Sequence, residues 1–203
     1  VERKSHAMRE SVGRIIETLR SVRKQKKIFL FLIAFFFFID GVYTIIDMAT
    51  AYGSALGLDS TGLLLALLVT QFVAFPFSIL FGRLAEKYDT GKLILTCIAA
   101  YMGITVFAVF MKAQWQFWVL AIFVGMFQGG IQALSRSYFA KIVPPERSGE
   151  YFGLMDICGK GASFMGTTVV GLASQAFGSI NIGISAIVFL FLAGALFFMK
   201  TEH

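Results

Sequence analysis

Six polar side chains interrupt long apolar runs in this 203-residue chain. They are Asp40, Gln71, Gln128, Gln132, Asp156 and Lys160. A charged group in the hydrocarbon of a membrane costs about 2.5–3.5 kcal/mol or more, so such groups usually face a bundle interior or a wet cavity. There they can bind a polar solute, carry a proton or form an ion pair. These six residues are therefore the candidates for chemistry.

Asp40 and Lys160 are predicted to lie at similar depth. At the helical rise, Asp40 is ~18 Å beyond Ile28. Lys160 is ~14 Å beyond Tyr151, again near the middle of a bilayer. One hypothesis is that Asp40 and Lys160 meet across two helices and bind a substrate, carry a proton or form a switchable lock. Alternatively, Asp156 lies four residues before Lys160, so these two can pair along one helix.

The glutamines offer neutral hydrogen bonds. Gln128 and Gln132 are one helical turn apart and share a face. Amides in such positions often hold neighbouring membrane helices together, and they can also bind a solute. Both interpretations stay open for this pair, and Gln71 lies on a different apolar run.

The elements that carry these residues are six apolar runs of spanning length. The chain is 57% hydrophobic and only 15% charged, which is unusual for a soluble domain. A spanning helix needs about 20 mostly apolar residues. The six runs are approximately Ile28–Ala51, Thr61–Gly82, Leu93–Met111, Trp115–Phe139, Tyr151–Phe177 and Ile180–Met199. The sequence therefore predicts an all-α, polytopic membrane domain over residues 28–203, with antiparallel neighbours because the connections are short.

Basic residues alternate between the connections. Three follow the second run (Arg83, Lys87 and Lys92), and three mark the end of the fourth run and the loop after it (Arg136, Lys141 and Arg147). The connection after the third run has only Lys112, and those after the first and fifth runs have no Lys or Arg. Because Lys and Arg mark cytoplasmic loops, both termini and the second and fourth connections are predicted to be cytoplasmic.

Residues 1–27 form a separate, basic segment that contains nine of the 18 Lys and Arg residues. Few aromatics accompany these bases, so an anionic membrane surface is favoured over nucleic acid as the partner. Apolar residues recur within it at helical spacing: Val12, Ile15, Ile16, Leu19 and Val22. This pattern predicts a cytoplasmic linker with an amphipathic helix on the membrane surface, and a solvated, partly helical linker is the alternative.

Polar residues divide the six runs into two groups. Runs one, two, four and five carry polar side chains in their middles, whereas runs three and six are apolar there. We therefore expect the first group to line a cavity or a partner and the second to face lipid.

Helix breakers and small residues add to this pattern. Pro76 should kink the second run. Gly125 and Gly129 form a G-x-x-x-G pair that lets another helix approach closely. Gly161 belongs to a glycine-rich fifth run, which either packs tightly or bends during a conformational change.

Other function classes find little support in the sequence. We find no nucleophile–base arrangement and no phosphate-binding loop, so an enzyme is not expected. The only histidines, His6 and His203, lie at opposite ends of the chain, so no metal site is expected. No cofactor is expected either.

The segment Gly82–Lys92 resembles the cytoplasmic loop that characterises the major facilitator superfamily, G-x-L-a-D-r-x-G-r-k. Here Glu86 stands for the usual Asp and Lys87 for the usual Arg, and the second glycine is displaced to Gly91. In that family the loop acid pairs with neighbouring helix ends and stabilises one access state. The resemblance implies this gating role for Gly82, Arg83, Glu86, Lys87 and Lys92, and a solvated charged turn is the alternative.

A closer resemblance covers most of the chain. Four segments look like one branch of that superfamily, which includes fungal vacuolar amino-acid effluxers and many bacterial transporters. They are Phe-Phe-Phe-Ile-Asp40-Gly41-Val-Tyr-Thr44, Gly129-Gly-Ile-Gln-Ala-Leu-Ser-Arg136-Ser, Pro145-Glu-Arg-Ser-Gly-Glu150-Tyr-Phe-Gly153 and Gly159-Lys160-Gly161. Such proteins have twelve spans, so the resemblance implies that this chain matches the C-terminal six, arranged as two inverted three-helix repeats.

The resemblance also implies a function. It predicts half of a secondary active transporter in the plasma membrane of a bacterium, which exports a small solute such as an amino acid by alternating access. Asp40 is the candidate for proton coupling or for a substrate amine, and Lys160 is the candidate for a substrate carboxylate or a gating ion pair. The missing cavity wall would come from an N-terminal six-span half or from a second copy in a homodimer. The alternative is a non-transporting membrane module that binds lipid or supports assembly.

Overall fold

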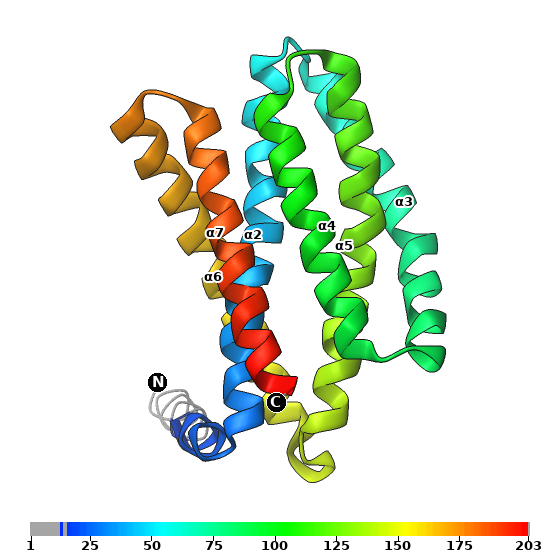
Figure 1. The fold of residues 1–203 in the computed structure, drawn as a ribbon, viewed down its shortest axis with the longest axis vertical. Coiled ribbons are helices and arrows are strands. Elements are labelled where there is room, and N and C mark those ends of the chain that lie inside the picture. The colour runs from blue at the N-terminus through cyan, green and yellow to red at the C-terminus, as the bar shows by residue number, and fades with distance from the viewer. Residues whose placement is uncertain (1–12, 14–15, 203) are drawn as a thin grey trace, which may run out of the picture.

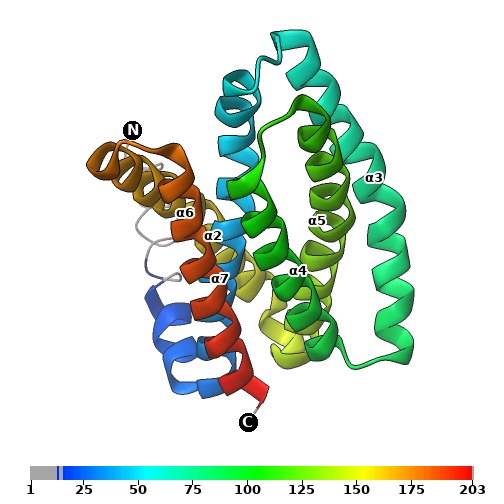
Figure 2. The same cartoon turned by 45° about the horizontal axis from the view of Figure 1, so that its top comes forward.

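The computed structural model describes residue 13 and residues 16–202, and every regular element in that part of the chain is helical. Figure 1 shows the helices as an antiparallel bundle, and Figure 2 shows it turned by 45°. The elements are α2 (Lys26–Ala55), α3 (Ser60–Lys87), α4 (Thr90–Phe110), α5 (Gln114–Ile142), the short 3-10 helix η1 (Pro145–Arg147), α6 (Ser148–Phe177) and α7 (Ile180–Glu202). The predicted all-α class is thereby confirmed.

A further helical segment, residues 16–24, precedes α2 and is separated from it by Gln25. We call it the linker helix. Figure 1 shows it lying across the end of α2, close to the end of α7. Val12 and Ile15, which belong to the predicted amphipathic pattern, lie outside the described residues.

Five helices in the described residues are long and apolar enough to cross a membrane: α2, α3, α4, α5 and the part of α7 over Ile182–Glu202. The sixth predicted span, α6, is a helix of 30 residues, but it is not among them. Asp156, Lys160 and many Gly, Ser and Thr residues lower its hydropathy. Length and composition therefore identify five of the six predicted spans.

The chain alternates in direction, so its basic connections gather at one end. In Figure 1 the α3–α4 and α5–α6 connections lie at the same end as the start of α2 and the end of α7. The connections with few or no basic residues, including residues 56–59, lie at the opposite end. The fold thus collects the charges that the sequence distributes over distant segments.

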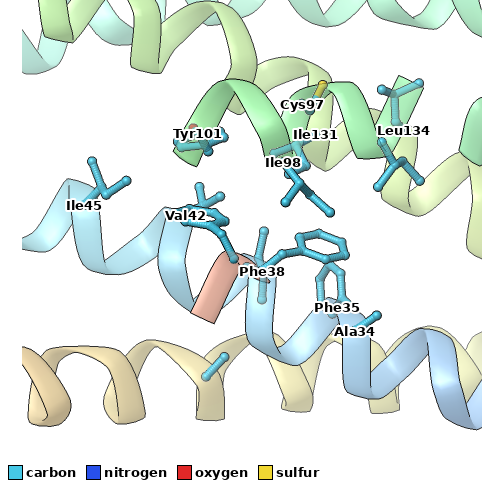
Figure 3. Packing of buried hydrophobic residues seen from close by; sticks show 14 of the residues in the cluster. Ala34, Phe35, Phe38, Val42, Ile45, Cys97, Ile98, Tyr101, Ile131 and Leu134 are labelled. Atoms are coloured by element: carbon cyan, nitrogen blue, oxygen red, sulfur yellow. The ribbon is translucent and has the colours of Figure 1, made fainter. Parts of the chain in front are cut away.

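α2 lies at the centre of the bundle and is the most buried of the five span helices. Its phenylalanines pack against rings from other helices: Phe31 stacks on Phe139 of α5 with ring centroids 5.3 Å apart. Figure 3 shows Phe38 and Val42 of α2 near Ile98 and Tyr101 of α4. These side chains belong to one continuous buried cluster. The abundance of Phe in the first apolar run is thus explained by its central place.

Helices α3 and α5 approach closely where α5 has glycines. A Cβ on Gly125 would lie 2.6 Å from the Thr70 carbonyl oxygen of α3, and one on Gly129 would lie 3.1 Å from the Ala74 carbonyl carbon. Backbone atoms cannot move aside as flexible side chains do, so glycine is required at both positions. By contrast, a Cβ on Gly161 would make only an ordinary contact, 4.0 Å from Phe36.

Helix α3 is the least buried of the five span helices. It packs chiefly on α5, and its other faces carry exposed apolar side chains such as Leu68, Phe72 and Phe75. Gln71 is exposed on the same helix. Pro76 lies inside α3, which continues as a helix to Lys87. The helices predicted to face lipid, α4 and α7, pack against each other on one side.

The prediction of a loop over Gly82–Lys92 is wrong in its extent. Gly82 to Lys87 form the last turns of α3, and α4 begins at Thr90, so only Tyr88 and Asp89 connect the two. Leu, Ala, Glu and Lys in this stretch favour a helix. The Asp89 carboxylate accepts a hydrogen bond from the Lys92 backbone N–H at 2.9 Å, which caps the start of α4.

Candidate functional site

A polar cavity of about 270 Å³ lies between α2, α5 and α6. Its lining combines apolar and charged side chains: Phe35, Ile39, Tyr43, Gln132, Arg136, Met155, Asp156, Gly159 and Lys160. Three of the predicted residues, Gln132, Asp156 and Lys160, therefore meet at one place. They come from two helices that follow each other in the chain, joined by η1.

An ion pair crosses this cavity. Arg136 Nη2 of α5 donates to Asp156 Oδ1 of α6 at 2.8 Å. The two side chains are 57% and 50% exposed. A half-exposed pair of this kind contributes only about 0–1 kcal/mol to stability in water. Folding therefore does not require the pair, and its groups remain accessible to a solute.

Neither of the two ion pairs predicted for Lys160 is found among the described residues. Asp156 pairs with Arg136 and not with Lys160, because α5 brings a guanidinium to the same depth. Asp40 does not meet Lys160 either, since its carboxylate contacts Gly166 and Thr44. Lys160 instead lines the cavity as an exposed side chain.

Asp40 is fully buried where α2 meets α6. Its Oδ1 accepts a hydrogen bond from the Gly166 backbone N–H at 2.8 Å and one from the Thr44 hydroxyl at 3.4 Å. Its Oδ2 has no hydrogen-bond partner among the described residues. A Cβ on Gly166 would overlap both the Thr44 hydroxyl and the Asp40 carboxylate. The contact therefore depends on a glycine at this position.

A second polar contact also links α2 and α6. Ser163 of α6 donates its hydroxyl hydrogen to Asp47 Oδ2 of α2 at 3.2 Å. Asp47 is exposed, and Tyr43 lies one turn before it on α2. Tyr43 also lines the cavity, whereas Asp47 and Ser163 are not among its lining residues.

The three glutamines occupy different surroundings. Gln132 lines the cavity. Gln128 is half-buried, and its side-chain oxygen is buried without a hydrogen-bond partner in the described residues. Gln71, on α3, is not among the cavity-lining residues. The structure thus brings one of the three to the charged site.

The end of the bundle with the basic connections has its own polar contacts. Lys141 Nζ donates to the Thr90 hydroxyl at 2.9 Å, which joins α5 to the start of α4. The Tyr138 hydroxyl of α5 donates to Glu202 of α7. Glu86, by contrast, is exposed, and the two hydrogen bonds above are made by Lys141 and Tyr138.

Sequence reasoning missed Arg136, Tyr43 and Gly166 as site residues. Arg136 was interpreted only as one of the basic residues that orient the helices in the membrane, although its depth along the helix can be counted from the helix end. It lies six residues before the end of α5, about 9 Å, and Asp156 lies eight residues after the start of α6, about 12 Å. Opposite charges at matched depth on consecutive antiparallel helices are the signal that could have found this pair.

Comparison with known proteins places the site in context. The family model described as "Vacuole effluxer Atg22 like" matches residues 2–202. The chain is 44% identical over 194 residues to the "Uncharacterized MFS-type transporter YxiO" of Bacillus subtilis, which covers 96% of this chain and 45% of that protein. It is 29% identical over 178 residues to "Autophagy-related protein 22" of Saccharomyces cerevisiae, covering 79% of this chain and 33% of that protein.

A further similarity, to "Autophagy-related protein 22" of Cryptococcus neoformans, is 26% identity over 198 residues, with 89% of this chain and 35% of that protein covered. The chain therefore spans less than half the length of these relatives.

Proposed function

The chain belongs to the Atg22-like vacuole effluxer family of MFS-type transporters, and we propose that it forms one six-helix half of a secondary active transporter for a small solute. Membership of this family makes it a multi-pass membrane protein and a transporter relative, not an enzyme. The proposal concerns what its own residues contribute to transport.

One observation carries the proposal: charged side chains are exposed about 9–18 Å inside the ends of helices that belong in a membrane. Arg136, Asp156 and Lys160 lie around the cavity between α2, α5 and α6. Facing lipid, each charge would cost about 2.5–3.5 kcal/mol or more. The arrangement is favourable only if this face borders water or protein, as the wall of a transport path does.

We infer that α6 is the sixth span. Its 30 residues would extend about 45 Å, enough to cross a bilayer. Its charged residues lie on the cavity side, beside α2 and α5, and this explains how a helix of low hydropathy fits in a membrane.

The packing also supports two inverted repeats, α2–α4 and α5–α7. If α2 corresponds to α5, then α3 corresponds to α6 and α4 to α7. Two pairs of contacts agree with this correspondence: α3 packs on α5 as α6 packs on α2, and α5 packs on α4 as α2 packs on α7. The contact between α6 and α7 departs from it, since α3 and α4 touch far less. Repeats of this kind rock about a central site in secondary transporters.

The opposite wall of the path would come from another six-helix half. The relatives are more than twice as long as the matched region, which favours an N-terminal half in the full-length protein. Pairing of two copies of this chain is the other arrangement. Light scattering of the chain alone in detergent distinguishes them, because a strict monomer excludes the homodimer.

The charges around the path fit a zwitterion such as an amino acid. Arg136 and Lys160 are cationic and Asp156 is anionic, and all three line the cavity. Asp47, also anionic, accepts a hydrogen bond from Ser163 on α6. A carboxylate would replace Asp156 as the partner of Arg136, and Lys160 would hold it further. The freed Asp156 would then bind the amino group. Asp40, with one carboxylate oxygen unpartnered, is the group proposed to take up and release a proton.

The gathered basic residues support the predicted orientation. Lys87, Lys92 and Lys141 lie at the end that contains the start of α2 and the end of α7. By the positive-inside tendency this end faces the cytoplasm. In a bacterial cell this membrane would be the plasma membrane.

Uptake into proteoliposomes tests the function. The full-length protein is screened with amino acids, with and without a proton gradient, and then Arg136→Gln and Lys160→Ala are compared. Both variants should lose uptake and keep their size-exclusion profile, and Asp40→Asn should remove the response to the gradient. Lys112→Ala, outside the cavity at the other end of the bundle, is the matched control. Unchanged flux in the cavity variants would favour a non-transporting module that binds lipid or supports assembly.

A further inference from the structure

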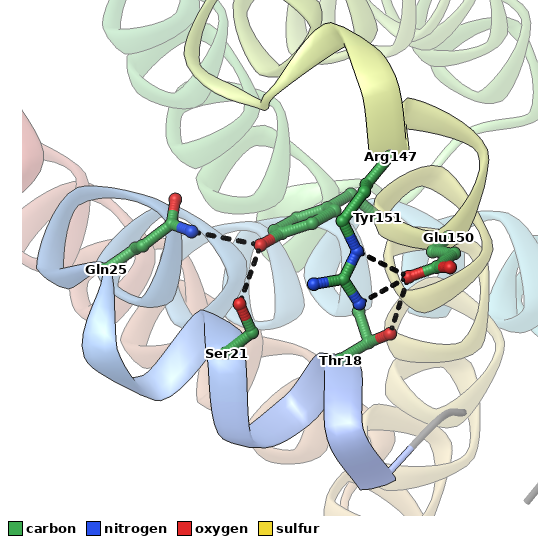
Figure 4. A network of polar contacts seen from close by, with 6 residues as sticks. All are labelled: Thr18, Ser21, Gln25, Arg147, Glu150 and Tyr151. Atoms are coloured by element: carbon green, nitrogen blue, oxygen red, sulfur yellow. Dashed lines mark hydrogen bonds and ion pairs between the residues drawn. The ribbon is translucent and has the colours of Figure 1, made fainter. Parts of the chain in front are cut away.

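The linker helix is joined to the start of α6 by a polar network, which Figure 4 shows. The Tyr151 hydroxyl accepts a hydrogen bond from Gln25 Nε2 at 3.0 Å and lies 3.3 Å from the Ser21 hydroxyl. The Thr18 hydroxyl donates to Glu150 Oε2 at 3.1 Å. The same Glu150 oxygen accepts two hydrogen bonds from Arg147, at 2.7 and 3.0 Å. One face of the linker helix is therefore committed to α6.

This docked face is largely polar, contrary to the usual arrangement of an amphipathic helix on a protein core. Thr18 and Ser21 provide its hydrogen bonds, joined by Gln25 directly after the helix, and Val22, only 2% exposed, provides its apolar contact. Tyr151 is likewise buried. The helix thus uses its polar residues to bind protein.

The opposite face combines exposed apolar and basic side chains. Ile16 is 53% exposed and Leu19 is 47% exposed. Three basic residues of the linker helix are also exposed: Arg20, Arg23 and Lys24. Lys26 and Lys27, at the start of α2, are exposed as well, and Lys27 Nζ lies 5.8 Å from the centroid of the Tyr138 ring. Glu17 is the one acidic residue in the described range 16–27. Apolar side chains among many cations, with little opposing charge, match the chemistry of an anionic bilayer surface.

We propose that residues 16–27 bind anionic lipid headgroups and that the linker helix transmits this binding to the start of α6. Ile16 and Leu19 insert between lipids, while the basic side chains bind the headgroups. Tyr151 and Glu150 connect the opposite face to α6, the helix that also carries Asp156 and Lys160. The lipid contact itself does not depend on the proposed transport function. An acidic protein partner is the competing occupant, and the test distinguishes it.

The lipid contact is tested with a fluorescent probe in the full-length protein. Leu19→Cys, in a background without other cysteines, is labelled with an environment-sensitive dye and reconstituted into two kinds of vesicle. One kind contains phosphatidylcholine alone, and the other also contains phosphatidylglycerol. We expect a blue shift and quenching by brominated lipid in the anionic vesicles. Glu146→Cys, on exposed η1, is the control and should stay water-like in both.

Charge reversal separates electrostatic binding from simple insertion. Arg20→Glu combined with Arg23→Glu should abolish the difference between the two vesicle types. A probe at Leu19 that stays water-like in anionic vesicles would overturn the proposal and leave a protein partner as the occupant. A response that survives charge reversal would also overturn it, because binding would then be independent of headgroup charge. Size-exclusion profiles check that each variant is folded.

Hydrogen exchange tests the transmission to α6. In the parent protein, phosphatidylglycerol should slow amide exchange both in residues 16–24 and in the first turns of α6. Tyr151→Phe removes the hydroxyl that joins the two elements but keeps the buried ring. In this variant the blue shift at Leu19 should remain, while the slowing in α6 is lost. If the exchange of α6 in the parent protein is the same in both lipids, the linker helix transmits nothing.

Discussion

Replacement of Gly166 by Ala is the sharpest test of how α6 is held against α2. Ala has a higher helix propensity than Gly by about 1 kcal/mol, so the substitution would stabilise an isolated helix. In the folded protein the added methyl group would overlap the Thr44 hydroxyl and the Asp40 carboxylate, which are both fully buried. Propensity and packing therefore predict opposite signs at this position.

The magnitude follows from two losses. Overpacking of a tight interior costs about 1–3 kcal/mol. Separation of the helices would also break the 2.8 Å hydrogen bond from the Gly166 N–H to Asp40, and a hydrogen bond to a charged group is worth about 1.5–3 kcal/mol. After the gain in propensity, we expect a net destabilisation of about 1.5–5 kcal/mol.

The assay is unfolding in detergent, by heat and by increasing SDS, with Gly171→Ala as the matched control. Gly171 lies on the same helix, and a Cβ there would meet no atom within 4 Å. The control should be as stable as the parent or slightly more so. Thr44→Ala in the Gly166→Ala background should recover part of the loss, because one of the two overlaps disappears. If Gly166→Ala and Gly171→Ala unfold alike, the reasoning about this contact is refuted.

Three further predictions concern other contacts. Arg136→Asp and Asp156→Arg should each abolish uptake while changing the free energy of unfolding by only about 0–1 kcal/mol. Uptake that is partly restored in the double variant would identify an interacting pair. A large loss of stability in either single variant would contradict an exposed ion pair. Gly129→Ala should destabilise the protein by about 1–3 kcal/mol, because the added Cβ would meet the α3 backbone. Gly103→Ala is the control and should not destabilise it, since no atom lies within 4 Å of the added Cβ. Equal unfolding midpoints for the two variants would exclude the close approach of α3 and α5. Tyr138→Phe should cost about 1 kcal/mol by removing its hydrogen bond to the end of α7, and an unchanged midpoint would mean that this bond does not join the helix ends in solution.

The helices themselves were predictable because their cause is local. Twenty apolar residues in a row have few alternatives in a bilayer, since the backbone must satisfy its own hydrogen bonds there. The predicted starts and ends accordingly lie within a few residues of the helices, as for α4, predicted over Leu93–Met111 and observed over Thr90–Phe110. The larger error, the supposed loop at Gly82–Lys92, arose because charge was interpreted as the end of a helix. Charged residues continue a helix readily once it leaves the membrane.

Partners of the polar residues were much harder to predict. Asp156 and Lys160 have the spacing of an i,i+4 pair, yet Asp156 pairs with Arg136 from another helix. Spacing along a helix gives only the contacts a side chain can make locally. Which distant side chain competes for it depends on how two helices are rotated and shifted against each other.

The sequence by itself determined that the chain is helical, apolar enough for a membrane, alternating in charge between its connections, and interrupted at mid-depth by a few polar groups. These properties depend on short-range physics: the hydropathy of a run, the period of a helix and the preference of cations for one side. Only the tertiary structure decided that α2 is central, that Asp40 meets a backbone N–H made accessible by Gly166, and that Arg136, Asp156 and Lys160 share a cavity. Those contacts join residues 20 to 126 positions apart, and packing of whole helices, which no local pattern encodes, brings them together.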